Sequence, residues 1–147
     1  MVHGSLLRRL GIIGILAALF GCSPDTPSEP TIPGRWYTAQ QVNLGRELFL
    51  THCAICHGEN AEATPDWRTT DDAGNYPPPP LNGSAHAWHH PLTVLERMIT
   101  DGGIPLGGVM PGFGSILDSD ERHATIAYFQ SFWTDEIYAN WLRLGAR

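Results

Sequence analysis

Two cysteines and a histidine lie close together in the segment Cys53-Ala54-Ile55-Cys56-His57. Their spacing matches C-x-x-C-H, the signature of covalent haem attachment. Two cysteines about one helical turn apart can reach the two vinyl groups on one edge of a porphyrin. The histidine that follows is then placed to bind the iron from one face. The segment predicts a single covalently bound haem c, with His57 as an axial ligand of its iron.

Paired cysteines also serve other chemistry, and each alternative needs surroundings that this sequence lacks. A thioredoxin-like redox pair would lie in a βαβ pattern, and no such pattern surrounds Cys53 and Cys56. A structural zinc site needs four ligands, usually as two spaced pairs. Only histidines could supply the second pair, and His57 follows Cys56 too closely for a usual finger. A disulfide could form in an oxidising compartment, but the adjacent histidine favours haem attachment.

A second axial ligand is expected from the later part of the chain. Met110 precedes Pro111 in a glycine-rich turn, where the backbone can approach a cofactor closely. Met98 is the other candidate, but it falls in the middle of an expected helix, and we expect it in the core. Thioether ligation favours reduced iron and raises the reduction potential relative to two histidines. Met110 is therefore the predicted distal ligand, with simple loop packing as the alternative.

The segment that contains His86, His89 and His90 holds a cluster of histidines. On one face of a helix these three side chains could bind copper or zinc. The alternative is a loop beside the cofactor with histidines in solvent. Pro91 suits the first position of a helix, which places the helix after the cluster and favours the loop. His123 has no evident partner and is also expected in solvent.

Helices are expected on both sides of the attachment motif. The first should begin at Thr38, which forms a capping box with Gln41, and should run directly into Cys53. Residues 58–82 lack periodicity and are expected to form a surface loop. A second helix follows Pro91 and ends at Gly102.

Two more helices are expected after the Met110 turn. The first opens at Asp118, with Glu121 three residues later as an acidic capping box. A final short helix is expected over residues 135–144, with Ile137, Trp141 and Leu142 on one side. Strand patterns are weak throughout, so the sequence predicts an all-α fold.

The N-terminal residues differ in composition from the rest of the chain. Residues 1–21 combine Arg8 and Arg9 with an apolar run over residues 10–20, which is typical of a signal peptide. The run ends at Cys22 in a pattern that resembles the lipobox of bacterial lipoproteins, which implies a lipid anchor on that cysteine. Residues 22–34 carry a proline at every third position and are expected to form an extended linker. The folded domain is therefore predicted over residues 35–147.

The chain is acidic, with 15 acidic residues against 9 basic ones, all of them arginine. Removal of the signal peptide would take away two arginines and leave a net charge near -8, from 7 remaining arginines and 15 acids. Such a chain will not bind nucleic acid by neutralising phosphates. Complementary charge steers encounter, so its redox partners should offer a basic docking surface.

The chain from Thr38 to Trp133 resembles a small bacterial class I cytochrome c. The resemblance is carried by Gly45, Phe49, Cys53, Cys56, His57, Met110, Pro111, Leu117, Asp118, Glu121 and Tyr128. It implies three main helices around one haem, a first helix packed against the last, and Met110 as distal ligand. It also implies that a proline carbonyl, from Pro79 or Pro80, accepts the ring N–H of His57.

This resemblance implies a periplasmic monohaem cytochrome that passes single electrons between partners in a respiratory or dehydrogenase chain. Such a protein is an electron carrier rather than an enzyme, and it would be held at the membrane by a lipid on Cys22. Two alternatives stay open: a tightly bound cytochrome subunit of an oxidoreductase, and a haem-based ligand sensor in which Met110 gives way to a gas. The sequence names neither the electron donor nor the acceptor.

Overall fold

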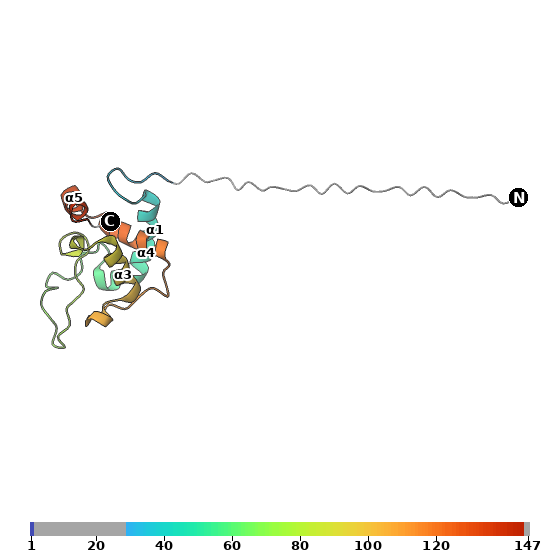
Figure 1. Cartoon of the computed structure of the whole chain (residues 1–147). Helices are drawn as coiled ribbons and strands as arrows, with labels where there is room; N and C mark the ends of the chain where they lie inside the picture. Colours follow the sequence, from blue (N-terminus) through green and yellow to red (C-terminus); the bar gives the residue numbers. More distant parts are fainter. Residues whose placement is uncertain (2–28, 146–147) are drawn as a thin grey trace.

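The computed structural model describes Met1 and residues 29–145. The helices of the described chain are α1 (Ala39–His52), α2 (Ala54–His57), α3 (Leu92–Asp101), α4 (Ser119–Gln130) and α5 (Asp135–Arg143), with short 3-10 helices η1 (Ala87–His89) and η2 (Ile104–Leu106). Extended pairing among the described residues is limited to one isolated bridge between Thr31 and Thr38. The all-α prediction is confirmed. Figure 1 shows the helices gathered into one body.

The predicted signal peptide, the lipobox cysteine Cys22 and residues 22–28 of the linker lie outside the described residues. The division of the chain at residues 21 and 34 therefore stays a prediction. In the part that the structure describes, no helix combines the length and apolar character needed to cross a bilayer.

The starts of α1 and α4 are set by side chains that the sequence singled out. Thr38 Oγ1 accepts a hydrogen bond from the backbone N–H of Gln41 at 3.1 Å, and Gln41 Oε1 accepts one from Thr38 N at 3.0 Å. Asp118 and Glu121 make the same reciprocal pair at the start of α4. Each box satisfies backbone donors that a helix start leaves free. Both predicted capping boxes are confirmed.

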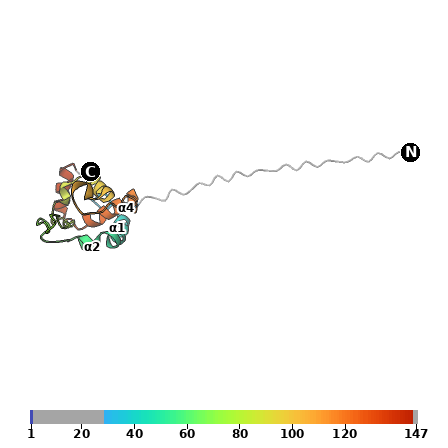
Figure 2. The same ribbon diagram turned by 90° about the horizontal axis from the view of Figure 1, so that it is seen from below.

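Helices α1 and α4 lie side by side in both views of the molecule (Figures 1 and 2). Their closest approach is at Gly45, because a Cβ atom built there would lie 1.9 Å from the carbonyl oxygen of Ala124. One turn further on, the rings of Phe49 and Tyr128 pack with centroids 5.2 Å apart. The predicted contact between the first helix and the later one is confirmed.

A polar network joins α3 to α4 through the carboxylate of Glu96. Ser119 Oγ donates to this carboxylate at 3.1 Å, and Arg122 Nη2 does so at 3.3 Å. His123 Nε2 lies 3.3 Å from the second carboxylate oxygen. The expectation that His123 lies free in solvent is wrong, because helix packing brings a carboxylate from α3 to it. Helix α3 begins at Leu92, and Pro91 is its N-cap residue instead of the expected first helical position.

Helix α5 closes the described chain with a buried aromatic face. Trp141 is fully buried and its Nε1–H donates to the carbonyl of His90 at 2.8 Å. Tyr138 is buried on the same face, whereas Leu142 is 37% exposed. The prediction that Leu142 shares the inner face is wrong. Residues three apart share a helix face more closely than adjacent ones, so Tyr138 accompanies Trp141 inward.

Candidate functional site

The attachment motif lies where α1 passes into α2. Cys53 ends α1 and caps α2, and its carbonyl accepts the backbone N–H of His57 at 2.9 Å. The motif is therefore wound as one tight helical turn. Cys53 is buried, Cys56 is exposed, and both thiols are free of disulfides. Burial, followed by the proximity of Cys56, raises the pKa of the Cys53 thiol to about 11.

His57 is held in one orientation by the loop that follows it. Its side chain is buried, and Nδ1 lies 3.1 Å from the carbonyl oxygen of Pro79. A carbonyl can only accept, so Nδ1 carries the proton and the lone pair is on Nε2. Burial lowers the pKa of His57, although the hydrogen bond to Pro79 opposes that shift. A neutral, oriented imidazole with a free Nε2 has the form in which histidine can bind a metal. The expected proline carbonyl is that of Pro79.

The loop over residues 58–82 is closed by a hydrogen bond between its own residues and is tied to the helical body at two places. The carbonyl of Ala61, a fully buried residue, accepts the backbone N–H of Leu81 at 2.8 Å. Tyr128 Oη on α4 donates to the carbonyl of Glu59 at 2.9 Å. Trp133 Nε1 donates to the carbonyl of Leu81 at 2.8 Å. These bonds fix both ends of the loop and so position Pro79 beside His57.

Met110 lies on the segment between η2 and α4, and it packs half-buried against the core. Its carbonyl accepts the backbone N–H of Gly103 at 2.9 Å. Gly102 has a φ of +76°, and a Cβ atom there would lie 2.5 Å from the same carbonyl oxygen. Only glycine allows this close turn, which confirms the expected glycine-rich setting of Met110. Met98 is half-buried on α3 rather than in the core.

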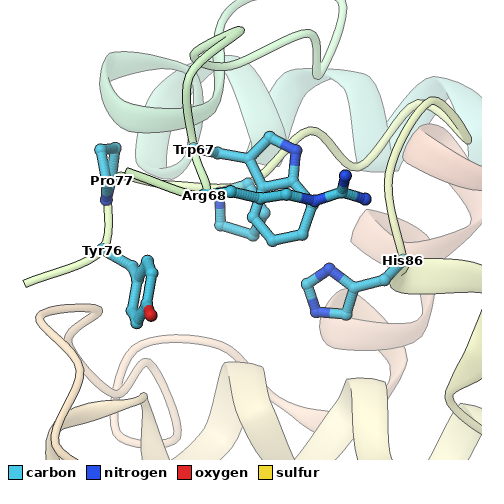
Figure 3. Close-up of a pocket in the computed structure, with 6 residues that line it drawn as sticks. Trp67, Arg68, Tyr76, Pro77 and His86 are labelled. Carbon is cyan, nitrogen blue, oxygen red and sulfur yellow. The ribbon is translucent and has the colours of Figure 1, made fainter. Parts of the chain in front are cut away.

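A pocket of about 400 Å³ opens beside Pro79 (Figure 3). Its lining residues are Trp67, Arg68, Tyr76, Pro77, Pro79 and His86. The rings of Trp67 and His86 are stacked, with centroids 4.9 Å apart and planes at 24°. The Arg68 guanidinium carbon lies 4.8 Å from the centroid of the Trp67 ring. Sequence reasoning missed this pocket; a tryptophan next to an arginine in an aperiodic loop was the available signal.

The histidine cluster does not form a metal site in the described chain. His86 and His90 contact edge to face with ring centroids 5.4 Å apart, and His89 packs against Trp88 at 3.9 Å. The segment forms one short 3-10 turn, η1, so these side chains do not share a helix face. Within the described residues, no three histidine, cysteine or carboxylate side chains are grouped closely enough to hold an ion.

Comparison with known proteins agrees with this geometry. The family model described as "Cytochrome C oxidase, cbb3-type, subunit III" matches residues 40–129. The match runs from the start of α1 almost to the end of α4 and includes the attachment motif, Pro79 and Met110. No curated protein and no solved structure matches the chain. The chain belongs to the family of c-type cytochrome domains described as cytochrome c oxidase, cbb3-type, subunit III.

Proposed function

We propose that this chain carries single electrons between redox proteins through one haem joined covalently to Cys53 and Cys56. The observation that carries the proposal is the state of His57. Its imidazole is buried, its pKa is lowered, and the Pro79 carbonyl holds the Nδ1 proton. Nε2 is thereby left as the metal-binding atom, which is the role of a proximal ligand. When bound, the haem would supply a one-electron Fe(III)/Fe(II) couple.

Met110 is the proposed second axial ligand. The turn that carries it is shaped by Gly102 and tied by the Gly103 N–H, so protein contacts fix its backbone position. A thioether on one face and an imidazole on the other would fill both axial positions with protein side chains. No substrate then binds at the metal, and little ligand motion accompanies electron transfer.

The proposal extends to where the protein acts. We propose a periplasmic location, with a lipid on Cys22 and residues 22–34 as a spacer between membrane and domain. Tethering raises the local concentration of a carrier near a membrane partner. The excess of acids over arginines, 15 against 9 in the whole chain, supports partners with a basic docking surface.

The proposal is tested on full-length protein made with a haem-maturation system. A pyridine haemochrome spectrum should report one covalently bound haem, and oxidised protein should show the red charge-transfer band of methionine ligation. Replacing Met110→Leu should abolish this band and lower the potential, whereas Met98→Leu on α3 should preserve both. A colourless mature protein contradicts the electron-carrier role. A red band that persists in Met110→Leu removes Met110 as ligand.

A second function, as a fixed subunit of an oxidoreductase, is favoured by two observations. The family description names an oxidase subunit. In addition, Ile104, Leu106 and Val109 before the Met110 turn are 63, 78 and 52% exposed. Clustered exposed apolar side chains often mark protein interfaces. Size-exclusion of a native extract separates the two functions, because a strictly monomeric cytochrome counts against a subunit role.

A further inference from the structure

The indole of Trp133 holds the end of the loop that supports His57. Trp133 is buried, and its Nε1–H donates to the carbonyl of Leu81 at 2.8 Å. The backbone N–H of Leu81 donates in turn to the carbonyl of the fully buried Ala61, also at 2.8 Å. Both polar groups of the Leu81 backbone therefore have partners. One bond alone would let this segment pivot, whereas two bonds to different parts of the chain also fix its orientation.

The orientation of Leu81 bears directly on the carbonyl of Pro79, which accepts the Nδ1 proton of His57. Only Pro80 and Leu81 lie between that carbonyl and the one that Trp133 holds. Peptide planes are rigid, and the ring of Pro80 fixes its φ angle. Few soft dihedral angles remain in this short stretch. A displacement of the Leu81 carbonyl is therefore passed on to the Pro79 carbonyl instead of being absorbed.

Trp133 belongs to a C-terminal part of the chain that lies beyond the residues matched by the family model, which end at 129. The same part covers the segment after the loop. Gly83 is buried with a φ of +96°, and a Cβ atom there would lie 3.1 Å from Ile137 Cδ1 and 3.2 Å from Trp133 Cδ1. Further along, Trp141 donates to the carbonyl of His90. These C-terminal contacts hold residues 81–90 against the helical body.

We propose that Trp133 is a positioning residue for the proximal ligand and that it lowers the reduction potential of the bound haem. The inference rests on the proposed function. A carbonyl that accepts the Nδ1 proton of His57 makes the imidazole a stronger electron-pair donor through Nε2. A stronger donor favours the more highly charged Fe(III) state, and hydrogen bonding around an axial ligand is one means of setting the potential. Without the indole N–H, the bond from Nδ1 to Pro79 weakens and the potential rises.

Trp141 offers a matched control for this role. It is fully buried, and its Nε1–H also donates to a backbone carbonyl at 2.8 Å, that of His90. Removing either indole N–H leaves one carbonyl without its donor, so the two variants should lose similar stability. Only the Trp133 bond ends two residues away from Pro79. A difference in potential between the two variants therefore reports positioning and not stability.

The test compares Trp133→Phe with Trp141→Phe in the full-length holoprotein. Potentiometric titration should give a higher potential for Trp133→Phe. At a fixed ambient potential, the ratio of reduced to oxidised protein should rise by about threefold, which a one-electron couple registers as about 28 mV. Trp141→Phe should keep the potential of the unaltered protein. A potential in Trp133→Phe that is unchanged or lower, or an equal rise in both variants, overturns the inference.

A second measurement follows the hydrogen bond itself. In the reduced holoprotein, nuclear magnetic resonance should detect the Nδ1 proton of His57 beside the Pro79 carbonyl. Its exchange with deuterium should be faster in Trp133→Phe than in Trp141→Phe, because the acceptor is no longer held in place. Equal exchange in the two variants contradicts the positioning role.

Gly83→Ala disturbs the same contact while keeping the indole, and it decides the question if Trp133→Phe does not fold. Its Cβ atom would press on the Trp133 and Ile137 side chains, so the potential should again rise. Gly74→Ala is the matched control, because Gly74 has a φ of +85° and open space around it. An unchanged potential in Gly83→Ala contradicts the inference. Absence of a haemochrome spectrum from the unaltered protein overturns the proposed function, whereas normal spectra with unchanged potentials overturn this inference alone.

Discussion

Replacing Gly45→Ala should test the contact on which the whole helical body depends. A Cβ atom at this position would lie 1.9 Å from the carbonyl oxygen of Ala124 and 2.5 Å from its carbonyl carbon. Both are backbone atoms in α4, so neither can rotate away as a flexible side chain would. The two helices must separate for the methyl group to fit.

Two effects of opposite sign decide the size of the change. Alanine is favoured over glycine inside a helix by about 1 kcal/mol, which alone would stabilise α1. Ordinary contact begins near 3.4 Å, so α1 and α4 would have to move apart by about 1.5 Å in a close-packed core. Overpacking of this kind costs up to about 3 kcal/mol. The net loss should be about 2 kcal/mol, or a melting temperature lower by about 8 °C for a domain of this size.

Thermal unfolding followed by far-ultraviolet circular dichroism measures this change. Asn43→Ala is the matched control, since Asn43 is exposed on the same helix and gains only helix propensity. Its melting temperature should equal or slightly exceed that of the unaltered protein. If Gly45→Ala melts at or above the unaltered protein, the close approach of α1 and α4 is not as described.

Three further changes have defined outcomes. Trp141→Phe removes a buried N–H donor to the segment before α3 and should cost about 1 kcal/mol; an unchanged melting temperature would contradict this role. Burial raises the pKa of Glu96, but the donors on α4 lower it more, so it lies below 4.5. Because the pKa is lower in the folded state, the ionised carboxylate stabilises the protein at pH values above its unfolded-state pKa, and this stability is lost as the pH falls. The urea concentration at the midpoint of unfolding should therefore decrease once the pH is below about 4.5, and it should decrease less in Glu96→Gln. Gly102→Ala places a Cβ atom 2.5 Å from the Met110 carbonyl at a positive φ and should weaken the methionine band, whereas Gly107→Ala, with a similar φ but open space, should retain it.

Local features of this protein follow from the sequence alone. The capping boxes at Thr38 and Asp118 involve residues three apart, so chain geometry brings their partners together in any fold. The attachment motif likewise lies within one helical turn from Cys53 to His57. The Pro79 carbonyl was anticipated only through the resemblance to class I cytochromes, because it meets His57 across 22 residues.

Other features were decided only when distant segments packed together. Three contacts join residues that are far apart in the chain, so their spacing in the sequence does not predict them. They are the stacking of Trp67 on His86, the approach of Glu96 to His123, and the packing of Tyr138 against Tyr37. Periodicity specifies which side of a helix is apolar, but not which neighbour covers it. Helix propensity and turn chemistry act over a few residues, whereas a pocket requires several loops to close around one volume. The sequence by itself thus determined the helices and the haem-attachment motif, and the tertiary structure alone decided the pocket and the half-buried imidazole of His86 that lines it.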